Sequence, residues 1–430
     1  MARSAAILGV YLLGHEAGQT RVGVLTRDRE GRTAFVVDEV WLRDPHRPVL
    51  SLAWQVPHDD GQTQARLASR GDKIGLHGLL PPWFAGLLPE GALRELVMAE
   101  MGPGDHDQFD LILRLGADLP GAVLVVPETA LPASAGPLQL ATVEGFQAPW
   151  PDGNVKFSLA GVQLKFAICE AYDRLTIPAR AGEARFILKV ASDRFPGLPE
   201  AEYAGMRLAA LVGIETARCR LIETDKVDAV PAEFLRHGAT ALMVERFDRR
   251  ADGGRIHIED AGQIVGAIGE RKYTMATTEM ILNMIRRFST DWRADVLEGM
   301  RRIVVDVLVG NGDNHLKNWS FIFPVPGVVR LSPAYDIVPT VLYAPDDRLA
   351  LKFAGTHDFA NVTYRRFRRV AAFLDLDPDW IEREMKAVVR KALDLWPSAA
   401  AQMLDERRAH MLIERLQTLA LVKDLDASLP

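Results

Sequence analysis

Two polar side chains that follow an apolar segment have the types and spacing that phosphoryl transfer uses. In GNGDNHLKN, residues 310–318, Asp313 and Asn318 stand five positions apart. A carboxylate can orient an attacking hydroxyl and accept its proton, while an amide oxygen five residues later can hold a metal ion bound to phosphates. Asp336, which follows a second turn in SPAYD, offers another oxygen ligand of the kind that Mg²⁺ prefers.

The same loop also has a structural interpretation. The Asn-Gly pair before Asp313 is typical of a hairpin turn, and Asp313 and Asn318 could satisfy local backbone groups. His315 and Lys317 are explained more simply as a packed imidazole and a solvated charge. The pair Asp313 and His315 could also bind a metal, but no other clustered histidine accompanies it. The loop taken alone leaves these alternatives open.

Two segments upstream could bind a nucleotide. FSLAGVQLKFAI, residues 157–168, has the outline of strand, turn and strand. Backbone N–H groups in such a turn can hold phosphate oxygens, although a plain hairpin explains it equally well. Lys189 ends an apolar strand, where an unpaired ammonium is costly. We expect it to pair with ATP phosphates and with Glu202 of the helix predicted for 200–212, unless it extends from an edge strand to solvent.

The segment ALMVERFDRR, residues 241–250, runs from an apolar strand into a charged turn. Such a connection between two lobes can present backbone groups to the edge of an adenine. Phe247 could then pack on the base and Asp248 could reach the ribose. An ordinary charged strand end is the alternative for this segment alone. However, these features occur in the order in which a two-lobed kinase uses them. The order is the turn in 157–168, Lys189, Glu202, the hinge in 241–250, the loop at 310–318 and finally Asp336.

Composition limits the remaining possibilities. With 430 residues, 48% of them hydrophobic and 25% charged, the chain can bury the cores of two or three domains. A net charge of −6 argues against a chain that coats nucleic acid by itself. Its two cysteines form no CxxC pair, which argues against a thiolate zinc site and favours the cytoplasm. The apolar residues 5–13 lack a cleavage signal, and no run is long enough for a membrane span.

The element pattern predicts an α+β, two-lobed protein-kinase-like fold with an N-terminal β-rich domain. Residues 1–127 read as strands followed by helices, and 128–150, rich in Ala, Pro, Ser and Gly, as a linker. Residues 151–247 form the predicted β-rich nucleotide lobe. Residues 248–430 form the predicted all-helical lobe. The helices expected in this last region span 275–288, 292–309, 364–374, 380–395 and 398–422.

Nearly the whole chain resembles the HipA family of bacterial serine/threonine kinases, the toxins of HipBA-type toxin–antitoxin pairs. The motifs that carry this resemblance are VYLLGHEAGQTRVGVL, FAGLLPEGALREL, LGADLPGAV, FSLAGVQLK, FILK, AEY with MRLAALVGI, VERFDR, GNGDNHLKN and SPAYDIVPT. The resemblance implies that Asp313 is the catalytic aspartate and that Asn318 and Asp336 bind the metal. It also implies that Ser158 is an autophosphorylated serine, although an ordinary strand hydroxyl is the alternative. The resemblance and the segments described above together give the expected nucleotide-binding residues, which are Ala160, Gly161, Val162, Gln163, Leu164, Lys165, Lys189, Glu202, Glu245, Arg246, Phe247, Asp248, His315, Leu316, Lys317, Asn318, Tyr335 and Asp336.

The resemblance further implies the cofactors and partners. ATP and Mg²⁺ would be required, and the target would be a protein of translation such as an aminoacyl-tRNA synthetase. A small helix-turn-helix antitoxin of the HipB type would be the partner, and DNA would be contacted only through it. The alternative from another class is a catalytically silent corepressor that keeps the fold and acts by docking an antitoxin on operator DNA.

Overall fold

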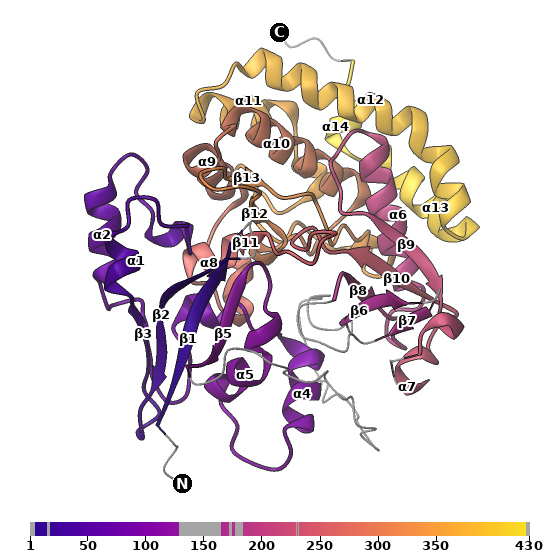
Figure 1. Cartoon of the computed structure of the whole chain (residues 1–430). Helices are drawn as coiled ribbons and strands as arrows, with labels where there is room; N and C mark the ends of the chain where they lie inside the picture. Colours follow the sequence, from indigo (N-terminus) through magenta and orange to yellow (C-terminus); the bar gives the residue numbers. More distant parts are fainter. Residues whose placement is uncertain are drawn as a thin grey trace.

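A computed structural model describes residues 5–14, 18–128, 165–171, 174–176, 184–228, 230 and 232–426. Three sheets organise these residues, two of five strands and one of three. In Figure 1 the N-terminal sheet lies at the lower left, the second sheet at the lower right, and the C-terminal helices above them. The predicted linker, apart from Glu128, lies outside the described residues.

The N-terminal sheet is antiparallel, with strand order β4-β3-β2-β1-β5. Its strands are β1 (Ala6–Leu13), β2 (Gln19–Arg27), β3 (Thr33–Val37), β4 (Ile74–Gly75) and β5 (Val123–Pro127). Alternate residues of β1 point to the core, where Leu8, Val10 and Leu12 pack with Trp83 and Phe84. The helices of this domain are α1 (Glu39–Arg43), α2 (Asp60–Ala68), α3 (Pro82–Ala85), α4 (Gly91–Glu100) and α5 (Gln108–Leu115).

The second sheet has the order β7-β6-β8-β10-β9. Its strands are β6 (Lys165–Ala171), β7 (Arg174–Thr176), β8 (Phe186–Lys189), β9 (Cys219–Glu223) and β10 (Thr240–Glu245). Helix α6 (Leu198–Leu211) packs on this sheet, and the short α7 (Ala232–Leu235) lies beside it. Helix α6 begins two residues before the predicted start at 200, with Pro199 inside its first turn, and Gly213 lies just beyond its end.

The C-terminal lobe is mainly helical, but the prediction that it is all-helical is wrong. It contains a three-stranded antiparallel sheet of β11 (His257–Asp260), β12 (Ser320–Phe323) and β13 (Arg330–Leu331). These strands are too short to carry a clear alternating pattern. The helices are α8 (Ala261–Val265), α9 (Thr278–Phe288), α10 (Trp292–Val309), α11 (Tyr364–Phe373), α12 (Pro378–Met403), α13 (Glu406–Leu416) and α14 (Ala420–Lys423).

The predicted helix boundary before Pro397 is also wrong. Helix α12 continues through this proline to Met403. A proline inside a helix removes a backbone hydrogen bond, which destabilises the helix. Packing of Trp396 and Ala400, which flank Pro397 and are fully buried, offsets this cost. The indole of Trp396 also donates a 3.0 Å hydrogen bond to the carbonyl of Leu208. The chain instead breaks after Met403, where the Asp405 side chain caps α13.

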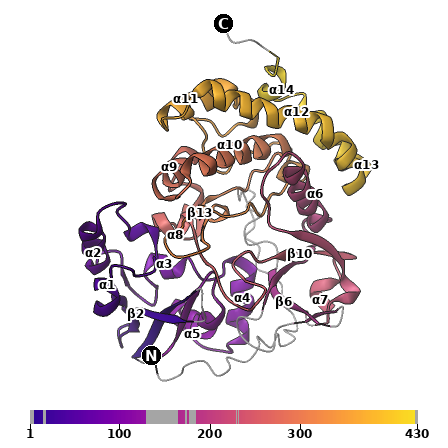
Figure 2. The same ribbon diagram turned by 45° about the horizontal axis from the view of Figure 1, so that its top comes forward.

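Helix α10 lies at the centre of the C-terminal lobe, beneath α11 and α12 in Figure 2. Its last turns are buried on all sides, since Val304, Val305, Val307 and Leu308 have no exposed surface. The loop that follows α10 therefore starts from a rigid base. No helix in the described part of the chain is long and apolar enough to cross a bilayer.

Candidate active site

A buried cluster of opposite charges joins the two lobes. Nζ of Lys189, at the end of β8, donates hydrogen bonds to Glu202 of α6 and to Asp336 of the C-terminal lobe. Lys189 is 3% exposed and Glu202 1%, so the alternative in which Lys189 extends to solvent is wrong. Lys165 lies directly opposite Lys189 in the sheet, and its Nζ donates a 2.8 Å hydrogen bond to Oδ2 of Asp336. The two lysines thus share one carboxylate.

The charges of this cluster are fixed by its pairing. Burial acts to raise the pKa of Asp336, but Lys165 and Lys189 outweigh it and hold that pKa well below its usual range. Burial alone would lower the pKa of Lys189, yet Asp336 and Glu202 raise it above its ordinary value. Asp336 also has a φ of 55°, in the left-handed region that few residues other than glycine adopt. Such backbone strain is typical of functional sites.

The predicted catalytic loop is not a hairpin, because it joins the end of α10 to a strand. Gly310, with φ of 72°, ends the helix, and a Cβ there would lie 2.4 Å from the Val341 side chain. Asp306 of α10 accepts hydrogen bonds from the side-chain amides of Asn311 (2.9 Å) and Asn314. These bonds tie the loop to the buried helix. The turn that Asn-Gly indicates is therefore a helix C-terminus.

Asp313 has the properties of a general base. It is 7% exposed, and burial raises its pKa to about 7, although a hydrogen bond from Tyr273 acts to lower it. The hydroxyl of Tyr273 lies 2.7 Å from Oδ1 of Asp313. A carboxyl group that titrates near neutral pH suits proton transfer. Nothing in the sequence near Tyr273 indicated this contact.

Asn318 lies close to Asp313 in the same loop. Its Nδ2 donates a 3.0 Å hydrogen bond to the backbone carbonyl of Asp313, so it does satisfy a local backbone group. This contact turns the amide Nδ2 toward the backbone and Oδ1 away from it. Asn318 and Asp336 together offer hard oxygen ligands, which fits Mg²⁺ bound with the help of phosphate oxygens. Among the described residues, no group of three or more His, Cys, Asp and Glu could hold a metal ion on its own.

His315, Leu316 and Lys317 have distinct environments. The His315 ring lies 5.2 Å from the Tyr273 ring, and neither ring nitrogen has a hydrogen-bond partner in the part of the chain that the structure describes. Burial lowers the pKa of His315 to about 3, so the imidazole is neutral. Leu316 belongs to the apolar core. Lys317 is not a solvated charge, because its Nζ donates to the carbonyl of Gly86 (3.1 Å) and pairs with a glutamate of the N-terminal domain.

A cavity of about 490 Å³ lies between the N-terminal domain, the nucleotide lobe and the C-terminal lobe. The predicted site residues on its wall are Lys165, Lys189, Glu245, Arg246, Phe247, Asp248, Lys317, Tyr335 and Asp336. Of the other described site residues, Glu202 lies behind Lys189, and the loop residues Asp313, His315, Leu316 and Asn318 are not among the lining residues. The predicted residues Ser158, Ala160, Gly161, Val162, Gln163 and Leu164 lie outside the described residues. The sequence did not indicate that Leu87, Leu88 and Asp118 of the N-terminal domain would also line this cavity.

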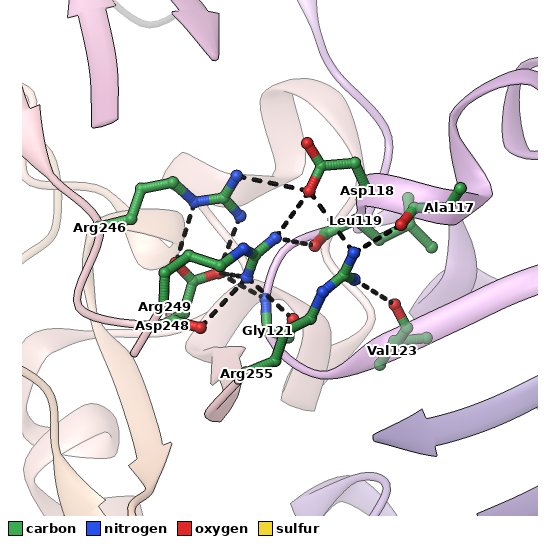
Figure 3. A network of polar contacts seen from close by, with 9 residues as sticks. All are labelled: Ala117, Asp118, Leu119, Gly121, Val123, Arg246, Asp248, Arg249 and Arg255. Atoms are coloured by element: carbon green, nitrogen blue, oxygen red, sulfur yellow. Dashed lines mark hydrogen bonds and ion pairs between the residues drawn. The ribbon is translucent and has the colours of Figure 1, made fainter. Parts of the chain in front are cut away.

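At the hinge, Phe247 and Tyr335 lie together with ring centroids 5.5 Å apart, and both line the cavity. Asp248 is buried in a polar network instead (Figure 3). It accepts hydrogen bonds from Arg246 (2.9 and 3.0 Å), from Arg249 (2.7 Å) and from the backbone N–H of Gly121 (2.8 Å). Both oxygens of Asp248 are therefore occupied, and its contact with a ribose stays a prediction.

The same network holds the N-terminal domain to the hinge. Asp118 pairs with Arg249 at 2.8 Å and lies 3.7 Å from both Arg246 and Arg255 (Figure 3). Burial acts to raise the pKa of Asp248, but Arg246 and Arg249 lower it to about 2. A carboxylate with this pKa is fully charged at neutral pH. The network thus fixes the hinge and the N-terminal domain relative to each other.

The architecture is that of a protein-kinase-like fold. A β-rich lobe holds the buried pair of Lys189 and Glu202, a hinge joins it to a mainly helical lobe, and that lobe holds the Asp313 loop. Comparison with known proteins identifies the family within this fold class. Residues 16–126 match the HipA N-terminal domain and residues 157–396 match the HipA-like C-terminal domain. The chain belongs to the HipA family of kinases. This confirms the predicted family and the α+β kinase-like class.

Relatives cover most of the chain. It is 35% identical over 403 residues to "Putative kinase Y4dM" of Sinorhizobium fredii, with 91% of each chain covered. It is 27% identical over 332 residues to the "Serine/threonine-protein kinase toxin HipA" of Shewanella oneidensis, covering 71% of this chain and 72% of the other. A solved HipA, HipB and operator DNA complex from Shewanella oneidensis MR-1 matches with a TM-score of 0.72 at 22% identity, covering 97% of this chain and 96% of that one. At this identity the match establishes the fold alone.

Proposed function

We propose that the protein transfers the γ-phosphoryl group of ATP to a serine or threonine hydroxyl of a protein, with Mg²⁺ as cofactor. The observation that carries this proposal is the buried cluster of Lys189, Glu202 and Asp336, which joins the two lobes beside the cavity. A lysine held by a helix glutamate, next to an aspartate of the opposite lobe, suits the binding of nucleotide phosphates.

Each residue of the site then has a role. Glu245, Phe247 and Tyr335 line the cavity and would hold the adenine, while Lys165 and Lys189 would bind phosphate oxygens. Asp336 and Asn318 would hold Mg²⁺, which supplies positive charge to the phosphates when bound. The two lysines must shift part of their pairing from Asp336 to the incoming phosphates.

Asp313 is the residue that moves a proton. In its deprotonated form it orients the attacking hydroxyl and accepts its proton as the oxygen–phosphorus bond forms and ADP leaves. Because burial raises the pKa of Asp313 to about 7, the group can take up this proton near neutral pH. Leu316 and His315 support the loop from the core side.

Family membership supports a role in a toxin–antitoxin pair. We propose that the protein acts in the cytoplasm on a component of translation, such as an aminoacyl-tRNA synthetase. Its partner would be a HipB-like helix-turn-helix antitoxin, through which it would reach DNA. Ser158 would be phosphorylated by the protein itself, and the added negative charge would oppose the binding of ATP phosphates.

The experiment is incubation of the purified chain with ATP and Mg²⁺, followed by mass spectrometry of its peptides. The expected result is phosphate on Ser158, none with EDTA, and none on Ser158→Ala. The second arm is calorimetric titration with ATP. A chain that binds no nucleotide would overturn the kinase proposal, and one that still binds an antitoxin–operator complex would then support the silent corepressor.

A further inference from the structure

Glu90 of the N-terminal domain reaches into the C-terminal lobe. It lies in the LLPEG motif, immediately before α4. Its Oε2 accepts a 2.8 Å hydrogen bond from Lys272, and its Oε1 lies 3.3 Å from Nζ of Lys317. Burial acts to raise the pKa of Glu90, but Lys317 and Lys272 outweigh it, so the carboxylate is charged. One carboxylate thus binds two cations of the other lobe.

Each of the two lysines is a chain neighbour of a residue in or beside the proposed catalytic centre. Lys272 precedes Tyr273, whose hydroxyl donates to Asp313. Lys317 precedes Asn318, and its backbone carbonyl accepts a 2.8 Å hydrogen bond from the hydroxyl of Tyr335. Tyr335 in turn precedes Asp336. Glu90 is therefore linked, by short contacts and chain neighbours, to the base and to both candidate metal ligands.

Helix α4 also contacts the nucleotide lobe. Leu96 is 1% exposed and packs in the same core as Phe166 and Leu188 of the second sheet. Figure 2 shows α4 between α5 and β6. The segment that begins at Glu90 therefore contacts the catalytic loop through Glu90 and the nucleotide lobe through Leu96.

We propose that Glu90 is a positioning residue that holds Lys272 and Lys317, and through them the catalytic loop, in the geometry for phosphoryl transfer. The N-terminal domain is then part of the catalytic unit. This inference rests on the proposed kinase function. Glu90 of the LLPEG motif is neither a proposed nucleotide contact nor a proposed metal ligand, and the inference gives it a separate role.

The alternative is that Glu90 only docks the domain, but other contacts do that independently. The Asp118 network holds the domain at the hinge (Figure 3). Glu259, which is fully buried in the C-terminal lobe, accepts hydrogen bonds of 2.7 Å from the backbone N–H of Leu52 and from the Trp83 indole. Loss of the Glu90 charge should therefore loosen the loop while the domain stays docked.

The test compares wild type with Glu90→Gln, which keeps the size of the side chain and removes its charge. Expected is a kcat lowered about 10-fold or more, because misplacement by about 1 Å can cost about 100-fold. The KM for ATP should change less than about 3-fold, since Lys165, Lys189 and the hinge residues do not contact Glu90. Hydrogen exchange should become faster in peptides covering 310–320 and stay unchanged in peptides covering 246–255. Glu95→Gln, on the exposed face of α4, is the matched control and should behave as wild type.

A second variant tests the coupling. Lys272→Met should lower kcat in the same direction, and the two effects should add incompletely, because both variants remove the Glu90–Lys272 contact. Unchanged kcat and loop exchange in Glu90→Gln would overturn the inference, as would faster exchange throughout the N-terminal domain. If wild type transfers no phosphate, the proposed function fails, and the exchange measurement still decides whether Glu90 holds the loop.

Discussion

The hydroxyl of Tyr273 donates a 2.7 Å hydrogen bond to Oδ1 of Asp313, the proposed base. A tyrosine hydroxyl thus contacts the carboxylate that would accept the proton of a substrate hydroxyl. The bond acts to lower the pKa of Asp313, against burial, which raises it to about 7. Tyr273 therefore influences the pH at which the base is charged.

Tyr273→Phe should make the reaction need a higher pH. Without the hydrogen bond the pKa of Asp313 rises further, and the charged, active form is populated only at higher pH. A bond worth about 1 kcal/mol corresponds to a rate roughly 5-fold lower below pH 7, with recovery above pH 8. The measurement is the pH profile of kcat. If the fall of kcat at low pH is the same in Tyr273→Phe as in wild type, the titration of Asp313 does not cause that fall.

Lys189→Met should abolish ATP binding and destabilise the fold. The substitution leaves Glu202, which is 1% exposed, as a buried charge without Lys189. Breaking a buried ion pair from one side costs about 3–5 kcal/mol of unfolding free energy. The double variant Lys189→Met with Glu202→Gln should recover much of that stability but no ATP binding. Urea unfolding and nucleotide titration check this, and a single variant as stable as wild type would refute the pairing.

Asp248→Asn should weaken the hinge network in a pH-dependent way. The pKa of Asp248 falls from 3.8 to about 2 in the folded protein. Its charge therefore contributes stability that is present above pH 4 and is lost as the pH falls through about 2. The shift corresponds to about 2 kcal/mol at pH 7.

The measurement for Asp248→Asn is urea unfolding between pH 7 and pH 2, which should show the difference from wild type shrinking as the pH falls. Asp252→Asn, at an exposed carboxylate of the following turn, should leave stability unchanged. A difference for Asp248→Asn that does not depend on pH would contradict the assigned role of the charge.

The order of the motifs predicted that Lys189 and Asp336 share one site, but the contacts made by the N-terminal domain could not be predicted from the sequence. Asp313 and Asn318 lie in one loop, and Lys189 and Glu202 are 13 residues apart on a strand and the next helix. Their spacing alone predicts their proximity. Glu90 is 182 residues from Lys272 and 227 from Lys317, and only the packed fold brings them together.

The errors in the fold have equally physical reasons. A strand of two to four residues, such as β13 or β11, is set by its partner strand rather than by its own pattern. The continuation of α12 through Pro397 depends on burial of Trp396, which no local propensity records. Local signals predict elements and short-range pairs, while tertiary packing decides the rest.

The most direct test of the central claim is single-turnover transfer of the γ-phosphoryl group from labelled ATP, with wild type and Asp313→Asn compared at saturating ATP and Mg²⁺. The account predicts label on protein with wild type and a loss of at least about 100-fold in Asp313→Asn, whose ATP affinity and melting temperature stay close to wild type. Undiminished transfer by Asp313→Asn would contradict it.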